Sequence, residues 1–239
     1  MPVEDHQDHG SNHENPSSSP RAVIRDLSAV DHAVYSAIAS TPAPSLDAPL
    51  RRLSTAANYS RIWFAIAAVL ALVGGRTGRR AAIAGASSVG LTAVLNVGLK
   101  TVGRRRPDRE EYGVPEGRRV RMPTSASFPS GHSAAGFAFA NSVSAQVPGL
   151  AFPLRVLALC VAYSRVHTGV HYPSDAIAGG IVGGVVGQTV AFVAHRGSRG
   201  RAGSAGSPLV ATRTMTGRTV RGRGQRPQGA RPVALGRGR

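Results

Sequence analysis

Residues 164–175 read Ser-Arg-Val-His-Thr-Gly-Val-His-Tyr-Pro-Ser-Asp, and residues 129–132 upstream of them read Pro-Ser-Gly-His. The longer stretch places a carboxylate, Asp175, four residues after His171, and the shorter stretch ends on His132. Two histidines, one of them paired with a carboxylate, supply both halves of a covalent phosphoryl transfer. One imidazole can attack, and the other, as imidazolium, can protonate the leaving oxygen. These two stretches therefore predict an active site.

Positive charge comes from a third segment, which holds Lys100 and, further along, Arg106 followed by Pro107. Lys100 is the only lysine among the chain's 29 lysines and arginines. The two residue types are not interchangeable as phosphate ligands, because an ammonium is a compact point charge and a guanidinium is a planar fork. A lone lysine near the two histidine stretches therefore indicates a binding site for phosphate oxygens.

Taken in order, residues 100–107, 129–132 and 164–175 resemble the three motifs of the type 2 phosphatidic acid phosphatase family, whose site is shared with vanadium haloperoxidases and bacterial acid phosphatases. The resemblance covers about residues 60–195, and the last two blocks match at every defining position. The first block is one residue short, with five residues between Lys100 and Arg106 where the family usually has six. On a helix this turns the lysine by about 100°. Either a loop absorbs this shift, or an adjacent arginine, Arg104 or Arg105, takes part of the lysine's role.

The resemblance implies a role for each matching residue. His171 is the nucleophile that forms a phosphohistidine, Asp175 binds its other ring nitrogen, and His132 is the general acid and later the base for the attacking water. The implied phosphate ligands are Lys100, Arg106, Ser130, Gly131 and Arg165. No metal or other cofactor is expected, because these cations and the free N–H groups of a helix that begins near Gly131 can stabilise the charge of the transition state.

Five apolar stretches separate the polar segments: residues 62–75, 81–99, 133–147, 150–163 and 176–194. A membrane-spanning helix takes about 20 apolar residues, which the second and fifth stretches provide outright and the others only with flanking residues. Neither of those two shows the charged face of an amphipathic soluble helix. Glycines at 179, 180, 183, 184 and 187 favour close helix packing in a membrane. The expected fold class is all-α: an integral-membrane helical bundle of about five spans, with N-terminal amphipathic helices and disordered ends.

Composition divides the chain into four parts. They are a disordered polar head (1–22), amphipathic interfacial helices (23–60), the phosphatase membrane core (61–195) and a disordered Arg/Gly-rich basic tail (196–239). Within the second part, one apolar face at helical spacing is formed by Val23, Leu27, Val30, Val34 and Ile38. This part either lies on the bilayer or forms a small cap packed on the bundle. Trp63, which follows it, is expected at the membrane interface.

The chain carries a net charge of +17, to which the basic tail contributes strongly. Because the neighbouring segments are apolar, the tail is expected to bind anionic lipid headgroups rather than nucleic acid. The three motif blocks fall at one end of the expected spans, and the tail falls at the other end with Arg76, Arg79, Arg80 and Arg155. The positive-inside rule then predicts a multi-pass protein of the cell membrane, with an extracytoplasmic active site and a cytoplasmic tail.

The leading prediction is a metal-independent membrane phosphatase that hydrolyses the phosphate or diphosphate of a prenyl lipid or a glycerolipid. One alternative is a vanadate-dependent enzyme like the haloperoxidases, with His171 as the vanadate ligand. Another is a membrane anchor without activity, whose basic tail binds nucleic acid or an acidic partner. The apolar spans argue against the first, since those haloperoxidases are soluble, and the intact motif blocks argue against the second. Residues 108–128 are expected to set the choice between monophosphate and diphosphate.

Overall fold

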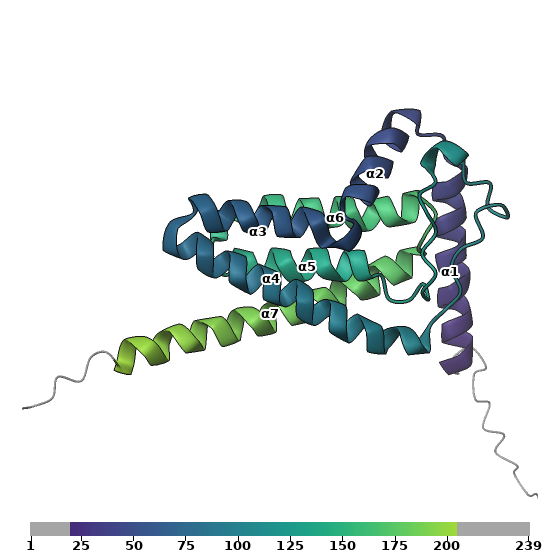
Figure 1. The fold of residues 1–239 in the computed structure, drawn as a ribbon. Helices are drawn as coiled ribbons and strands as arrows, with labels where there is room; N and C mark the ends of the chain where they lie inside the picture. The colour runs from purple at the N-terminus through teal and green to yellow at the C-terminus, as the bar shows by residue number, and fades with distance from the viewer. Residues whose placement is uncertain (1–19, 205–239) are drawn as a thin grey trace, which may run out of the picture.

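The computed structural model describes residues 20–204, and within them the chain forms helices and loops but no strands (Figure 1). The α-helices are α1 (Pro20–Ser40), α2 (Pro44–Ala56), α3 (Arg61–Val73), α4 (Gly75–Leu99), α5 (Gly131–Ser144), α6 (Ala151–His167) and α7 (Pro173–Ser204). Four short 3₁₀ turns lie between them: η2 (Asn58–Ser60), η3 (Lys100–Val102), η4 (Glu116–Arg118) and η5 (Pro148–Leu150). The all-α prediction is therefore confirmed.

Three helices of the described chain are long and apolar enough to cross a membrane: Gly75–Leu99, Pro148–His167 and Pro173–Gly197. A fourth span results if Pro44–Ala56 and Asn58–Val73, which meet at a bend of 64°, are counted as one. The first and third predicted stretches do form helices, but α3 has 13 residues and α5 has 14. Both are shorter than the ~20 residues that a bilayer needs, so the spans are three or four by length and composition.

Helix α5 is the centre of the bundle and packs against α4, α6 and α7. Ala134, Ala138, Phe139 and Val143 on this helix are fully buried. The Phe139 ring packs against the indole of Trp63 on α3, with the ring centroids 5.5 Å apart. The prediction that Trp63 lies at the membrane interface is therefore wrong, since its side chain is 1% exposed.

Trp63 fits into the core because a glycine on α5 leaves room for its indole ring. A Cβ atom built at Gly136 would lie 2.9 Å from Cζ2 of the indole, so the ring occupies the space that only glycine leaves. This packing fixes the position of α3 along the axis of α5. It thereby also positions the turn η2, which directly precedes α3.

Helices α5 and α7 touch along a seam of glycines. Gly179, Gly183 and Gly187 all face the backbone of α5, and a Cβ at Gly183 would lie 2.0 Å from the carbonyl oxygen of Ala134. The small-residue face predicted on α7 is therefore confirmed. At the end of the seam the amide of Ser130 donates to the carbonyl of Asp175 at 2.9 Å, which joins the starts of the two helices.

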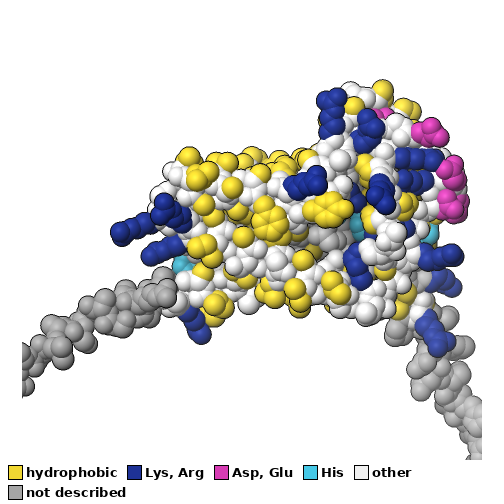
Figure 2. Space-filling model, viewed as in Figure 1, with side chains coloured by type: hydrophobic (Ala, Val, Ile, Leu, Met, Phe, Trp, Pro, Cys, Tyr) yellow, Lys and Arg dark blue, Asp and Glu magenta, His cyan; other side chains and the backbone are white. Residues whose placement is uncertain are grey.

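Helix α1 lies across the end of the bundle where α4 ends and α5 and α7 begin (Figure 1). The predicted apolar face is present, but it points away from the protein, since Leu27 and Val30 are 65% and 61% exposed. The adjacent side of the helix carries Asp31 and Tyr35, which are buried against the bundle. Figure 2 shows hydrophobic side chains along the length of the bundle and basic side chains at both of its ends.

The predicted polar head (1–22) and basic tail (196–239) can be compared with the structure only in part. Helix α7 continues to Ser204, past the predicted boundary of the core at residue 195. Residues 196–204 contain no proline, and their three arginines favour a helix, although their three glycines weaken it. The remainder of the predicted tail, and nearly all of the predicted head, lie outside the described residues.

Candidate active site

The three predicted motif blocks meet in one pocket of about 260 Å³ at the end of the bundle that α1 crosses. Lys100 follows α4, His132 lies in the first turn of α5, and His171 lies in the loop between α6 and α7. Arg106 and Gly131 line the same pocket. The rest of the wall is largely small or apolar and includes Ala57, Val89, Ala93 and Ala135. A cationic site therefore opens directly beside an apolar surface.

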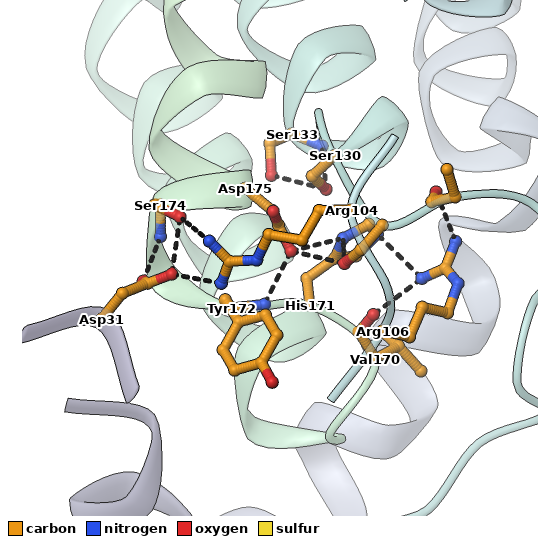
Figure 3. A network of polar contacts seen from close by, with 12 residues as sticks. Asp31, Arg104, Arg106, Ser130, Ser133, Val170, His171, Tyr172, Ser174 and Asp175 are labelled. Carbon is orange, nitrogen blue, oxygen red and sulfur yellow. Dashed lines mark hydrogen bonds and ion pairs between the residues drawn. The ribbon is translucent and has the colours of Figure 1, made fainter. Parts of the chain in front are cut away.

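His171 and Asp175 form the centre of the polar network (Figure 3). Nδ1 of His171 lies 3.5 Å from Oδ2 of Asp175, and the same carboxylate oxygen accepts from the amide of Tyr172 at 2.8 Å. The hydroxyl of Ser127 donates to that oxygen and lies 3.3 Å from Nδ1 of His171. Asp175 is completely buried. This environment places the imidazole proton on Nδ1 and leaves Nε2 unprotonated, with a lone pair that can attack.

Burial, together with the positive charges of Arg106 and Arg165, lowers the pKa of His171 from 6.5 to about 4, against the opposing effect of the hydrogen bond to Asp175. His171 is therefore neutral at physiological pH, which is the state that a nucleophile requires. Its Nε2 lies 3.5 Å from a guanidinium nitrogen of Arg106. A phosphate bound by that arginine would lie within reach of the nitrogen.

The short spacing in the first block does not displace Lys100 from the site. Helix α4 ends at Leu99 and gives way to the turn η3, so the geometry of a continuous helix no longer applies at Lys100. Its Nζ donates to Oγ of Ser125 at 2.7 Å and to the carbonyl of Ala126 at 3.2 Å. Burial lowers the pKa of Lys100, and the neighbouring Arg106 lowers it further.

Arg106 is fixed by backbone carbonyls on two sides of the pocket. Its Nε donates to the carbonyl of Ser125 at 2.8 Å, and one terminal nitrogen donates to the carbonyl of Val170 at 2.7 Å. The guanidinium therefore ties the loop of the first block to the loop that carries His171. Burial lowers its pKa.

The two alternative cations are placed elsewhere. Arg104 forms an ion pair with Asp31 on α1, donates to Oγ of Ser174 at 3.3 Å and stacks over the ring of Tyr172 at 4.0 Å (Figure 3). Its guanidinium is committed to joining α1 to the start of α7. Arg105 is exposed and lines separate surface depressions instead of the pocket.

Two predicted phosphate ligands lie behind the pocket wall. Ser130 is fully buried as the N-cap of α5, and its Oγ accepts from the amide of Ser133 at 3.5 Å and from the Ser133 hydroxyl at 3.1 Å. Arg165 is 1% exposed and donates to Oγ of Ser54 on α2 at 2.6 Å. Neither side chain is among the residues that line the pocket. The described residues include no cluster of three or more histidines, cysteines or acids suited to a metal.

Several polar residues at the site were missed by the sequence analysis. Ser127 could have been predicted to lie near the site, since it is two residues before the Pro-Ser-Gly-His block. Asp31, Ser54 and Asn58 carry none, because each lies in the N-terminal part of the chain and reaches the site only through the fold. His167, between the two motif residues Arg165 and His171, lies outside the pocket, and its Nε2 is 2.9 Å from Oδ1 of Asp47 on α2.

Comparison with known proteins places this geometry in a family. Residues 81–198 match the model of the PAP2 superfamily. Decaprenylphosphoryl-5-phosphoribose phosphatase of Mycobacterium tuberculosis is 34% identical over 173 residues, which cover 72% of this chain and 93% of that protein. The prediction of a phosphatase is therefore confirmed.

Two solved structures share the fold. The crystal structure of Aquifex aeolicus LpxE gives a TM-score of 0.53 at 23% identity, covering 67% of this chain and 94% of that one. A transmembrane PAP2-type phosphatidylglycerolphosphate phosphatase from Bacillus subtilis gives a TM-score of 0.54 at 20% identity, covering 72% and 87%. With the apolar helices of the described chain, these likenesses show a membrane protein. On the match to the family model and the 34% identical relative, the chain belongs to the PAP2 superfamily.

Proposed function

We propose that this protein releases inorganic phosphate from a prenyl-linked sugar phosphate of the decaprenylphosphoryl-5-phosphoribose class, through a phosphohistidine on His171. The observation that carries the proposal is the buried, neutral His171, with Nδ1 on Asp175 and Nε2 beside the guanidinium of Arg106 in an open pocket. The substrate class rests on the Mycobacterium tuberculosis relative, 93% of which is covered by this chain.

The proposed reaction begins with the phosphate bound among fixed positive groups. Lys100 and Arg106 contact its oxygens, and the free N–H groups at the start of α5 add hydrogen bonds. Arg165, behind the wall, adds positive charge without direct contact. This set neutralises the charge that spreads over the three equatorial oxygens in the transition state.

Two displacements then follow at phosphorus. Nε2 of His171 attacks the terminal phosphate, an N–P bond forms, and the P–O bond to the 5-oxygen of the ribose breaks while His132 protonates the departing oxygen. Neutral His132 next takes a proton from a water molecule, which attacks the phosphohistidine and frees inorganic phosphate. Asp175 accepts the Nδ1–H bond throughout and stabilises the positive ring.

The apolar side of the pocket supports a lipid substrate. Val89, Ala93 and Ala135 line the same pocket as His132 and His171. A lipid whose headgroup enters among the cations can therefore keep its chain against apolar helices. The same arrangement disfavours a soluble sugar phosphate, which would leave this wall wet.

The proposal also covers how the protein is oriented in the membrane, and it rests on α1, which crosses the end of the bundle that carries the pocket. The outward apolar face of α1 lies in the bilayer interface, and the pocket opens on the extracytoplasmic side, with the opposite basic end in the cytoplasm. The basic tail, outside the described residues, binds anionic headgroups there. These placements extend the proposal to topology.

The test is phosphate release by the full chain, purified in detergent, in the presence of EDTA. Substrates are decaprenylphosphoryl-5-phosphoribose, a prenyl monophosphate, undecaprenyl diphosphate and phosphatidic acid. We expect release in EDTA, fastest from the first substrate, and none from His171→Ala. A ³²P-labelled substrate quenched at short times should leave acid-labile label on the wild-type protein. Equal release by His171→Ala, or release that EDTA abolishes, would contradict the mechanism, and release from another lipid alone would contradict the substrate class.

A further inference from the structure

The corner between α2 and α3 forms one wall of the active-site pocket, although it lies outside the part of the chain that matches the family model. Ala57, Tyr59 and Ser60 line the pocket there. Tyr59 and Ser60 both have left-handed backbone angles, with φ of 55° and 57°. Residues other than glycine rarely adopt this conformation, and where they do the surrounding structure must impose it. The corner therefore has a defined shape that its neighbours maintain.

Packing on both sides of the corner supplies that constraint. Before it, Ser54 accepts from Arg165 at 2.6 Å and lies 3.4 Å from the hydroxyl of Thr168, so α2 is bonded to the end of α6. After it, Trp63 is buried against Phe139 on α5. The corner is thus positioned by the same helices that carry the catalytic loops.

Asn58 in this corner reaches across to His132. Its Oδ1 lies 3.0 Å from Nε2 of the histidine, although the two residues are 74 positions apart. An amide oxygen can only accept, so the bonded ring nitrogen must carry a proton. Among the described residues, Nδ1 of His132 has no hydrogen-bond partner, nor is it one of the buried unpaired atoms, and the side chain lines the pocket. The nitrogen left free is therefore the one that can meet the substrate.

We propose that Asn58 is a positioning residue for His132: its Oδ1 binds Nε2–H and thereby makes Nδ1 the nitrogen that exchanges protons with the substrate. The inference rests on the proposed function of His132 as general acid and base. In the first step Nδ1–H passes its proton to the leaving oxygen as the P–O bond breaks. In the second step Nδ1 takes a proton from the attacking water. In both steps Nε2 keeps its proton and its hydrogen bond to Oδ1 of Asn58.

The charges around His132 make such positioning necessary. All of the groups that act on it electrostatically are cationic or become so: Arg165, His171, Lys100 and Arg106. They oppose the imidazolium that protonates the leaving group, and the described residues show no carboxylate bonded to the ring. A neutral amide oxygen supports the imidazolium without neutralising the cations that bind phosphate.

The test compares kcat, KM and pH profiles of the wild type with Asn58→Leu and Asn58→Asp, on the substrate that the wild type cleaves. Asn58→Leu should lower kcat by about 10- to 100-fold with KM little changed, because general acid catalysis is lost while phosphate binding is kept. A carboxylate at this position favours the imidazolium, so Asn58→Asp should retain more activity. The alkaline limb of its kcat/KM profile should move to higher pH.

A double-mutant cycle and a matched control make the result specific. In a His132→Ala background, Asn58→Leu should cause no further loss of kcat, since the two residues act as one unit. The control is Asn141→Leu, which removes a hydrogen bond that the side-chain amide of Asn141 on α5 donates to the carbonyl of Gly184, away from the pocket, and should leave the pH profile unchanged. Additive losses, or an alkaline limb unmoved in Asn58→Asp, would overturn the inference. An inactive wild type would instead contradict the proposed function.

Discussion

At the scale of single residues, the burial of His171 sets how the enzyme should respond to acid. Only the neutral imidazole can attack phosphorus, and its pKa is lowered to about 4 by burial and by nearby positive charge. The rate should therefore persist well below pH 6.5 and fall as the pH approaches 4. Arg106→Gln removes one of the positive charges, so the pKa of His171 should rise and the acid limb of kcat/KM should move to higher pH.

The measurement is the kcat/KM profile of both proteins on the same substrate, because the titration of the substrate phosphate then affects both curves equally. Arg106→Gln also removes a phosphate contact, which lowers the height of the curve but not the position of its limb. A variant whose acid limb coincides with that of the wild type would show that another group controls the limb.

At the scale of helices, the seam between α5 and α7 gives a matched pair of neighbouring glycines. Gly183→Ala should destabilise the protein by about 1–3 kcal/mol, because its Cβ would meet the carbonyl of Ala134 and push the helices apart. Gly184→Ala should be nearly neutral, since the nearest atom to its Cβ lies at 3.6 Å. Thermal unfolding in detergent checks both, and equal unfolding temperatures would contradict the packing described.

The docking of α1 is a second prediction at this scale. Asp31 accepts from the amide and hydroxyl of Ser174, at 2.8 and 2.7 Å, and pairs with Arg104, so one carboxylate joins α1 to the first turn of α7. Asp31→Ala should cost roughly 1–3 kcal/mol of stability and lower kcat, because Asp175 follows Ser174 directly. The control is Asp26→Ala on the exposed part of α1, where side-chain loss should change neither. An Asp31→Ala protein with wild-type kcat and unfolding temperature would argue against this role.

The elements also show what the sequence could predict. The convergence of His132, His171 and Lys100 was predictable, because each block lies at a helix end and the helix order brings those ends together. The glycine seam was predictable from its spacing. Asn58 and Ser54 were not, since their partners lie 74 and 111 positions away and no local pattern records such contacts. Trp63 was misplaced because its position depends on a gap on another helix.

At the scale of the whole molecule, the proposed orientation predicts which end of the bundle faces outward. In a Cys160→Ser background, Glu116→Cys at the catalytic end should react with a membrane-impermeant maleimide in intact cells. Arg76→Cys, at the turn from α3 to α4, should react only after permeabilisation. Both positions are exposed in the fold, so access depends on the side of the membrane alone. The reverse labelling pattern would place the active site in the cytoplasm.

Lys100 has a practical consequence for the study of this protein. It is the chain's only lysine, and its amine lines the pocket with a lowered pKa. A larger share of that amine is unprotonated than in an ordinary lysine, so acylating reagents and aldehydes should find it reactive. Apart from the N-terminus the chain offers them no other amine. Chemical modification can therefore report ligand occupancy directly: bound phosphate should shield the one amine, and the mass of the intact chain would record the difference.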